Sequence, residues 1–136
     1  MAAELQYLDL ADFLLIAEAV TGIPAAALAT SERLVSQAES ALHVPQSGFS
    51  DVEAYATFAE KAAILCARVI QDHPLPDGNK RVGFLCLVEF IERNGYRLDL
   101  GDEDTPGRVA DVIIALAAHE ISEREFADWV AARITE

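Results

Sequence analysis

Apolar residues recur at intervals of three and four along most of this chain, which is the spacing of one face of an α-helix. Capping residues precede several of these stretches, and the pairs Gly22 with Pro24 and Asn94 with Gly95 end two of them. Six helices are predicted: between Asp9 and Gly22, from Thr30 or Ser31 to Leu42, from about Val52 to Gln71, from Gly78 to Asn94, from Thr105 to near His119, and from Ser122 to Ile134.

The helix expected over residues 78–94 differs from the others because it is apolar on nearly every side as far as Val88. Such a helix belongs in the middle of a bundle, where its neighbours cover all of its faces. Residues 96–100 alternate between apolar and polar and are compatible with a short extended segment. The chain shows no linker and no internal repeat. We therefore expect residues 1–136 to form a single all-α domain, a compact bundle of about six helices.

The amino-acid composition limits the kinds of partner that this protein is expected to bind. The formal net charge of −13 at pH 7 argues against direct binding of nucleic acid, because an acidic surface repels a phosphate backbone. No uncharged apolar run reaches the ~18 residues that a membrane span needs, and the N-terminus lacks the basic start of a secretory signal. We expect a cytoplasmic protein without membrane contact. Cys66 and Cys86 fall in apolar helical patterns and are expected to be buried and reduced.

Polar chemistry is concentrated in residues 73–81, His-Pro-Leu-Pro-Asp-Gly-Asn-Lys-Arg, between two helical stretches. The two prolines prevent a helix until about Pro76, and Asp-Gly supplies a turn, so the segment is expected to be a loop. A helix that restarts near Gly78 would place the amides of residues 78–81 in its first turn. Free amides and the positive end of the helix dipole form an anion site there.

The side chains of this loop add to that site. Lys80 and Arg81 bring two cations, and Lys80 is notable because Lys61 is the only other lysine of the chain. Asp77 offers a hard oxygen of the kind that holds Mg²⁺ beside the phosphates of a nucleotide. His73 could take a proton from an attacking hydroxyl near neutral pH. Together these groups favour phosphoryl or nucleotidyl transfer, although each alone is more often an ordinary loop or surface residue.

The whole stretch resembles the signature of the Fic/Doc family, His-x-Phe-x-(Asp/Glu)-Gly-Asn-(Gly/Lys)-Arg. The flanking segments 40–46, 55–63 and 90–96 are similar to those of Doc-type toxins, so the resemblance covers roughly residues 30–134. It implies ATP and Mg²⁺ as cofactors. It implies a catalytic set of His73 as base, Asp77 as metal ligand, and Lys80 and Arg81 as stabilisers of the transferring group. The implied nucleotide-binding residues are Gly78, Asn79, Lys80 and Arg81.

Two positions favour one branch of this family. Fic enzymes that attach AMP typically carry glycine at position 80 and a second arginine at position 84, where this chain has Lys80 and Phe84. The resemblance to Doc toxins therefore implies transfer of the γ-phosphate of ATP to a Ser/Thr hydroxyl of a protein. It further implies elongation factor Tu as the target, inhibition of translation, and a cognate Phd-like antitoxin whose C-terminal helical segment packs over the toxin. AMP transfer and a non-catalytic interaction module remain the alternatives.

Residues 43–52 break the helical pattern and are expected to form a surface loop. In Fic/Doc proteins the corresponding segment is an extended flap beside the active site, and Gln46 and Phe49 are its expected contacts with the target. The chain departs from the family at Leu75, which replaces the phenylalanine of the signature, and at Gln71 and Gly83. Leucine is expected to anchor the loop almost as well, because it too fills an apolar pocket.

Overall fold

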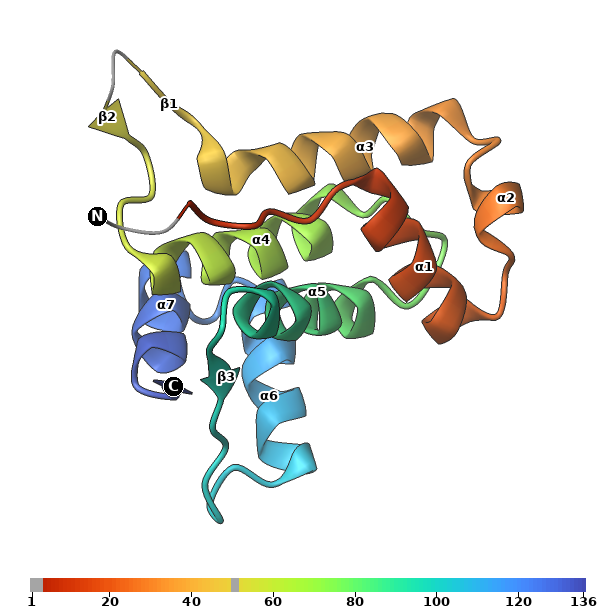
Figure 1. Ribbon diagram of the computed structural model, residues 1–136. Coiled ribbons are helices and arrows are strands. Elements are labelled where there is room, and N and C mark those ends of the chain that lie inside the picture. Colours follow the sequence, from red (N-terminus) through yellow and green to blue (C-terminus); the bar gives the residue numbers. More distant parts are fainter. Residues whose placement is uncertain (1–3, 50–51) are drawn as a thin grey trace.

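The computed structural model describes residues 4–49 and 52–136, and over these residues the fold is an α-helical bundle, as expected (Figure 1). The short strands form two separate two-stranded antiparallel pairs, β1 with β2 and β3 with β4. The elements in chain order are α1 (Leu10–Thr21), α2 (Ala25–Leu28), α3 (Glu32–His43), the 3-10 turn η1 (Val44–Gln46), β1 (Gly48–Phe49), β2 (Val52–Glu53), α4 (Phe58–Asp72), α5 (Asn79–Arg93), β3 (Arg97–Leu98), α6 (Pro106–Ala117), α7 (Glu123–Ala131) and β4 (Ile134–Thr135).

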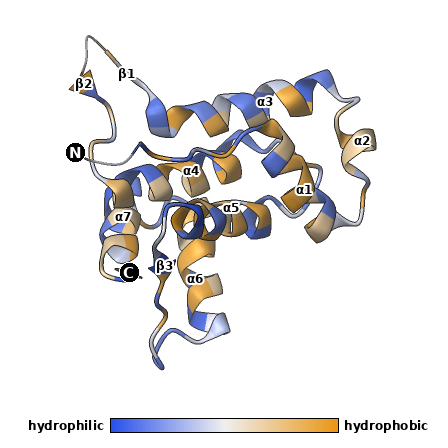
Figure 2. Cartoon of the chain, in the orientation of Figure 1, coloured by the Kyte–Doolittle hydropathy of each residue, from blue (hydrophilic) through white to orange (hydrophobic). Residues whose placement is uncertain are grey.

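Helices α4 and α5 form the centre of the bundle. α4 packs against α5, α3, α7 and η1, while α1 and α6 pack on α5. In Figure 2 the hydrophobic colour is strong on α5 and on α6, which packs against it. Gly83 lets them approach, because a Cβ there would lie 3.0 Å from Ile70 Cγ1 and 3.1 Å from the carbonyl oxygen of Cys66. The glycine that departs from the family pattern is therefore the contact point of the two helices that carry the loop.

Side-chain caps fix where most helices begin. Asp9, Ser31, Thr105 and Ser122 cap α1, α3, α6 and α7, and Ser31 is the one of the two expected starts of α3 that is used. Ser122 and Glu125 form a capping box. The expected start of α4 near Val52 is wrong: Thr57 caps it and Phe58 is its first residue. Residues 52 and 53 belong to β2 instead, because pairing with β1 satisfies their backbone.

Helical periodicity did not predict two short elements of the fold, the helix α2 and the strand β4. The short α2 lies between α1 and α3, and Ile134 belongs to β4 rather than to the last helix. β4 pairs with β3, with Leu98 opposite Ile134, so the alternating segment after Asn94 is extended as expected.

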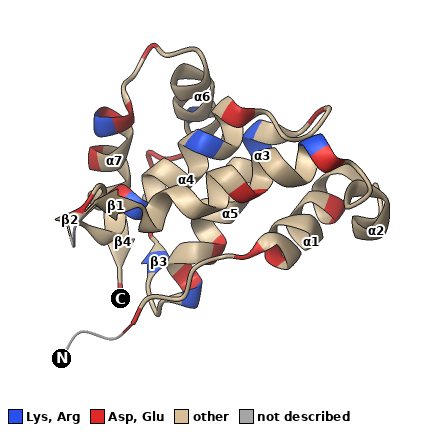
Figure 3. Ribbon diagram, turned by 90° about the horizontal axis from the view of Figure 1, so that it is seen from above, with Lys and Arg blue, Asp and Glu red and all other residues tan. Residues whose placement is uncertain are grey.

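Charged residues are spread over many elements in Figure 3, and acidic ones outnumber basic ones, in keeping with the net charge of −13. One ion pair has a structural role, because the guanidinium of Arg93 at the end of α5 donates to Asp12 at the start of α1 over 2.7 Å. The buried thiols match the expectation, and burial raises the pKa of Cys86 to about 12. Within residues 4–49 and 52–136, no helix has both the length and the apolar composition needed to cross a membrane.

Candidate active site

The loop that joins α4 to α5 begins at His73, whose backbone is left-handed (φ 53°, ψ 51°) and ends α4. Two residues later Leu75 turns into the core, where it is only 3% exposed. It occupies the anchoring position at which the family signature has phenylalanine. The leucine therefore still ties the loop to the core, as the sequence suggested.

Asn79 holds this loop from inside. It is 3% exposed, its Oδ1 accepts from the amide of Leu75 (3.0 Å), and its Nδ2 donates to the carbonyl oxygen of Leu75 (2.9 Å). These two bonds fix which end of the carboxamide is nitrogen, because exchanging the ends would set donor against donor and acceptor against acceptor. Through these two hydrogen bonds Asn79 connects the loop to the first turn of α5.

The same carboxamide also reaches the imidazole of His73. Its Nδ2 lies 2.7 Å from Nδ1 of that ring. Because this nitrogen of Asn79 is a donor, Nδ1 accepts, and the neutral ring carries its hydrogen on Nε2. The residue itself is exposed, so the ring lies outside the core and faces the first turn of α5.

The opening of α5 is unusual among the long helices because no side chain caps it. Gly78 is its N-cap residue, with φ 85°, rather than a member of the first turn as expected. The amide of Gly78 donates to Oδ1 of Asp77 over 2.8 Å. The next three amides, of Asn79, Lys80 and Arg81, have no intrahelical acceptor because they belong to the first turn. Free amides therefore start at Asn79, one residue later than expected.

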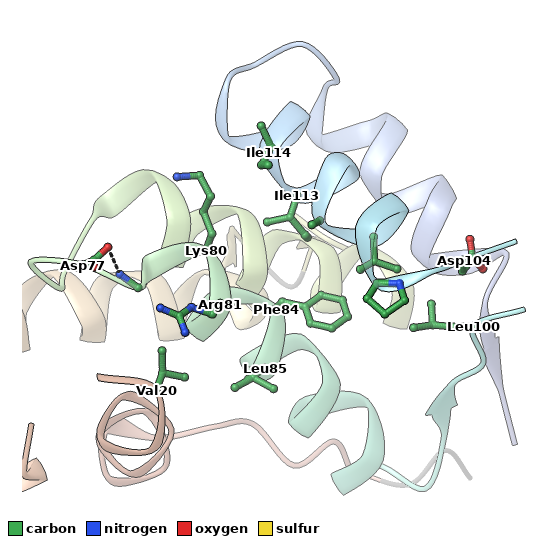
Figure 4. A pocket seen from close by; sticks show the side chains of 14 residues that line it. Val20, Asp77, Lys80, Arg81, Phe84, Leu85, Leu100, Asp104, Ile113 and Ile114 are labelled. Carbon is green, nitrogen blue, oxygen red and sulfur yellow. Dashed lines mark hydrogen bonds between the residues drawn. The ribbon is translucent and has the colours of Figure 1, made fainter. Parts of the chain in front are cut away.

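A cavity of about 710 Å³ runs from this opening along α5 toward α6, as Figure 4 shows. Asp77, Lys80 and Arg81 lie at one end, and Phe84 lies in the middle. The rest of the wall is largely apolar, and its residues are Val20, Gly78, Leu85, Leu100, Asp104, Pro106, Val109, Ala110, Ile113 and Ile114. The volume is in the range of small-molecule sites, and His73 is not part of the lining.

The cationic end of the cavity is built by α1, α5 and α6 together. The side chain of Lys80 extends from α5 toward Ile114 of α6, and that of Arg81 lies toward Val20 of α1 (Figure 4). A Cβ on Gly78 would lie 3.2 Å from Val20 Cγ1, so only glycine fits this left-handed position against α1. Two cations, Lys80 and Arg81, therefore line the end of the cavity beside the free amides.

A Mg²⁺ ion at the cationic end of the cavity would need oxygen ligands. Asp77 is exposed at the edge of the cavity, and its Oδ1 accepts from Gly78. Over the part of the chain that the structure describes, no three His, Cys, Asp or Glu residues gather in a way that could hold a metal ion. Mg²⁺ commonly uses one or two carboxylates and completes its shell with phosphates and water, and Asp77 is a carboxylate at the cationic end of the cavity. Asp77 fits the role of the single protein ligand.

The far end of the cavity was missed by sequence analysis. Asp104 lies there, and Arg133 donates to both of its carboxylate oxygens over 2.9 and 3.0 Å. This pairing holds the pKa of Asp104 below its ordinary value. Arg133 also stacks on Trp129, 4.3 Å from the ring centroid. The pairing joins positions 29 residues apart and therefore leaves no local signal in the sequence.

The end of α4 forms a second, polar wall beside His73. Gln71 and Asp72 line a cavity of about 420 Å³ together with Ser36, Gln37 and Ser40 of α3. Burial raises the pKa of Asp72, and the nearby charge of Arg68 opposes that shift. Gln71 therefore faces hydroxyl and amide groups of α3.

The segment expected to form a flap beside the active site forms η1 and the β1–β2 hairpin, and this hairpin lies far from the loop. Gln46 is exposed in η1, and Phe49 is 85% exposed on β1. The hairpin precedes the first residue of α4 and His73 follows the last, so the two lie at opposite ends of this helix (Figure 1). Fifteen helical residues span about 22 Å. The structure thus joins His73 to Asn79 and places Asp77, Lys80 and Arg81 on the wall of the cavity. Gln46 and Phe49 lie apart from both groups.

Comparison with known proteins now gives the class to which this fold and loop belong. The sequence model described as the Fic/DOC family matches residues 7–91, which is more than half of the chain. The chain belongs to this family. It is 35% identical over 60 residues to a protein named Toxin Doc from Mycolicibacterium smegmatis, and that match covers 44% of this chain and 46% of the relative. No solved structure gives a significant match.

Proposed function

We propose that this protein is a Doc-type toxin that transfers the γ-phosphate of ATP to a Ser/Thr hydroxyl of a protein, with elongation factor Tu as the expected acceptor. Membership of the Fic/DOC family and the similarity to Toxin Doc support the class. The observation that carries the proposal is the uncapped opening of α5, where free amides, Lys80 and Arg81 meet at the mouth of the cavity.

The arrangement suits a nucleotide bound along the cavity. A triphosphate has its negative charge at one end, which the amides and the two cations would stabilise, and such electrostatic stabilisation dominates phosphoryl transfer. The apolar wall around Phe84 would exclude water from the rest of the ligand. Mg²⁺, when bound to Asp77, would offset charge on the phosphates.

In this proposal His73 takes the proton of the attacking hydroxyl. That requires a lone pair on the exposed Nε2, whereas the contact with Asn79 favours the tautomer with hydrogen on Nε2. The hydrogen must therefore move to Nδ1, and Asn79 must withdraw its amide from that atom. We expect this exchange to accompany nucleotide binding, because the first turn of α5 carries both Asn79 and the phosphate site.

The direction of transfer rests on Lys80 and Phe84, as the sequence comparison within the family indicated. Lys80 lines one end of the cavity, at the position where AMP-transferring relatives have glycine. A cation at that position favours the orientation of ATP in which the γ-phosphate lies near His73. Inhibition of translation, the cytoplasm as the place of action, and neutralisation by a Phd-like antitoxin belong to the same proposal. An amphipathic C-terminal helix of the antitoxin would cover the apolar wall.

Intact-mass spectrometry of elongation factor Tu after incubation with the protein, ATP and Mg²⁺ tests this function. We expect a gain of one phosphoryl group, which His73→Ala abolishes. A gain of one adenylyl group would establish the AMP-transferring alternative. If the mass of elongation factor Tu does not change and the His73→Ala variant still inhibits growth, the non-catalytic interaction module is the remaining explanation.

A further inference from the structure

Asp104 forms the end of the cavity that lies opposite the uncapped opening of α5 (Figure 4). Its side chain is 15% exposed, and Arg133 donates to both of its oxygens, from Nη2 to Oδ1 (3.0 Å) and from Nε to Oδ2 (2.9 Å). The contact of Arg133 with the ring of Trp129 fixes the guanidinium in turn. The carboxylate is therefore held in one orientation on the cavity wall, and the function proposed above gives it no role.

A structural role accounts for the ion pair but not for its place in the cavity. The loop before α6 is also attached to the C-terminal segment by the amide of Asp99, which donates to the carbonyl oxygen of Arg133 over 2.6 Å. A partly buried ion pair can often be replaced by apolar residues without loss of stability. A carboxylate on the wall of a largely apolar cavity therefore needs a second explanation.

The hydrogen bonds of Asp104 leave a place for one more donor. A carboxylate offers about four acceptor positions, two on each oxygen. Among the residues that the structure describes, Oδ2 accepts from Arg133 and from the amide of Gly101 (3.2 Å), so both of its positions are filled. Oδ1 accepts from Arg133 and keeps one position. Because Arg133 holds the pKa of Asp104 below its ordinary value, the group is ionised at neutral pH and acts only as an acceptor.

The wall beside this carboxylate suits a flat aromatic ligand. Phe84 presents a half-buried ring in the middle of the cavity, and nucleobases stack on such rings. From Ile114, toward which Lys80 extends, to Pro106 at the other end, α6 rises about 12 Å. The cavity thus has cations at one end and an acceptor at the other. A nucleotide, which carries its phosphates at one end and its base at the other, matches this arrangement.

We propose that Asp104 is the residue that selects adenine, with Oδ1 accepting a hydrogen of the exocyclic 6-amino group. This inference rests on the proposed function and adds the residue that distinguishes ATP from other nucleotides. Guanine and hypoxanthine carry an oxygen at position 6, and two facing acceptors repel each other. Guanine can also bind a carboxylate through its N1 and 2-amino hydrogens. That contact needs an open position on both oxygens, and Oδ2 is already filled.

Binding of four triphosphates to the full chain, measured by isothermal titration calorimetry with Mg²⁺, tests this assignment. ATP carries the 6-amino group, purine riboside triphosphate lacks it, and ITP and GTP carry an oxygen in its place. We expect the wild-type protein to bind ATP about tenfold or more tightly than each of the others, which is the effect of one hydrogen bond to a charged group. Equal affinity for ATP and purine riboside triphosphate, or no binding of any nucleotide, would overturn the inference.

Asp104→Asn should change the preference. We expect the amide oxygen to take the place of Oδ2, which accepts two hydrogen bonds, so the NH₂ group replaces Oδ1 at the ligand. The variant should lose the advantage of ATP over purine riboside triphosphate and bind ITP more tightly than the wild type does. Glu103→Gln is the matched control, because it removes one charge from the same loop at an exposed position outside the cavity lining. If this control changed the order of affinities as Asp104→Asn does, net charge rather than the contact with Oδ1 would decide the order.

Arg133→Met tests whether Arg133 acts on selectivity through Asp104. Without the guanidinium, both carboxylate oxygens have an open position, so the affinity for GTP should rise toward that for ATP. Thermal denaturation of each variant gives the accompanying change in stability. If both substitutions lowered the affinity for all four nucleotides by the same factor, the ion pair would have only a structural role and the inference would fail.

The order of binding affinities is separate from the transfer reaction. If elongation factor Tu gains no phosphoryl group, the proposed function fails, while the ratio of affinities for ATP and purine riboside triphosphate still decides on Asp104. If phosphoryl transfer occurs with equal kcat/KM for these two nucleotides, the proposed function stands and the selection of adenine by Asp104 is refuted.

Discussion

At the scale of single residues, Asn79 connects the parts of the candidate site. Its carboxamide joins the backbone of Leu75 to the ring of His73, and it does so from a buried position at the start of α5. The family signature names this asparagine, but the signature does not say which atoms it binds. The structure adds that the amide faces Nδ1, which decides the tautomer of the base.

The tautomer can be measured directly. In the free protein, ¹⁵N NMR of the imidazole should show His73 with hydrogen on Nε2 and an accepting Nδ1 at pH values where the ring is neutral. Asn79→Ala removes the donor, so the ring should revert to a mixture of both tautomers. A wild-type ring with its hydrogen on Nδ1 would contradict the contact between Asn79 and His73, and His43, exposed near the end of α3, serves as an unconstrained reference.

At the scale of elements, α1 supports the site from outside the catalytic loop. Its last turn places Val20 against Gly78, and its first turn is tied to the end of α5 through Asp12 and Arg93. Both ends of α5 are therefore braced by one helix. The sequence predicted α1 as a helix but could not predict this pairing, because Asp12 and Arg93 are 81 positions apart.

The ion pair between Asp12 and Arg93 should make the stability of the fold decrease at acidic pH. The hydrogen bond from Arg93 lowers the pKa of Asp12 below its ordinary value of 3.8, so the pair stabilises the fold fully above that pH. The contribution is lost as the pH falls through the lower folded-state pKa. Chemical denaturation from pH 7 to pH 2 should show the free energy of unfolding declining below about pH 4.

Asp12→Asn provides the matched variant, because the amide oxygen can still accept from Asp9 in the capping box while the charge is gone. It should be less stable than wild type at pH 7, and the difference should shrink at the lowest pH. A constant difference across the whole range would show that the charge of Asp12 does not contribute.

At the scale of the whole molecule, the sequence predicted what local pattern and motif can encode. Helical periodicity and caps such as Ser31 and Ser122 gave most helix positions, and the apolar run through Val88 placed α5 at the centre. The start of α4 was missed because residues 52 and 53 pair in a strand, a contact that periodicity does not reveal.

The candidate site was likewise predicted only in part. Residues 73–81 are contiguous, so a fixed spacing identified them before any fold was known. The far wall with Asp104 and Arg133 and the distance between Phe49 and His73 both depend on tertiary packing. Such contacts join positions far apart in the chain, and a single sequence carries no signal for them.

The central physical claim is that the uncapped opening of α5 binds the phosphates of a nucleotide. Amide NMR shifts on titration with ATP and Mg²⁺ test it most directly, because they report on each backbone N–H. The account predicts the largest shifts at Asn79, Lys80 and Arg81, with smaller shifts along the cavity near Phe84. Saturating nucleotide that leaves these amides unmoved, or moves only residues outside the loop and the cavity, would contradict it.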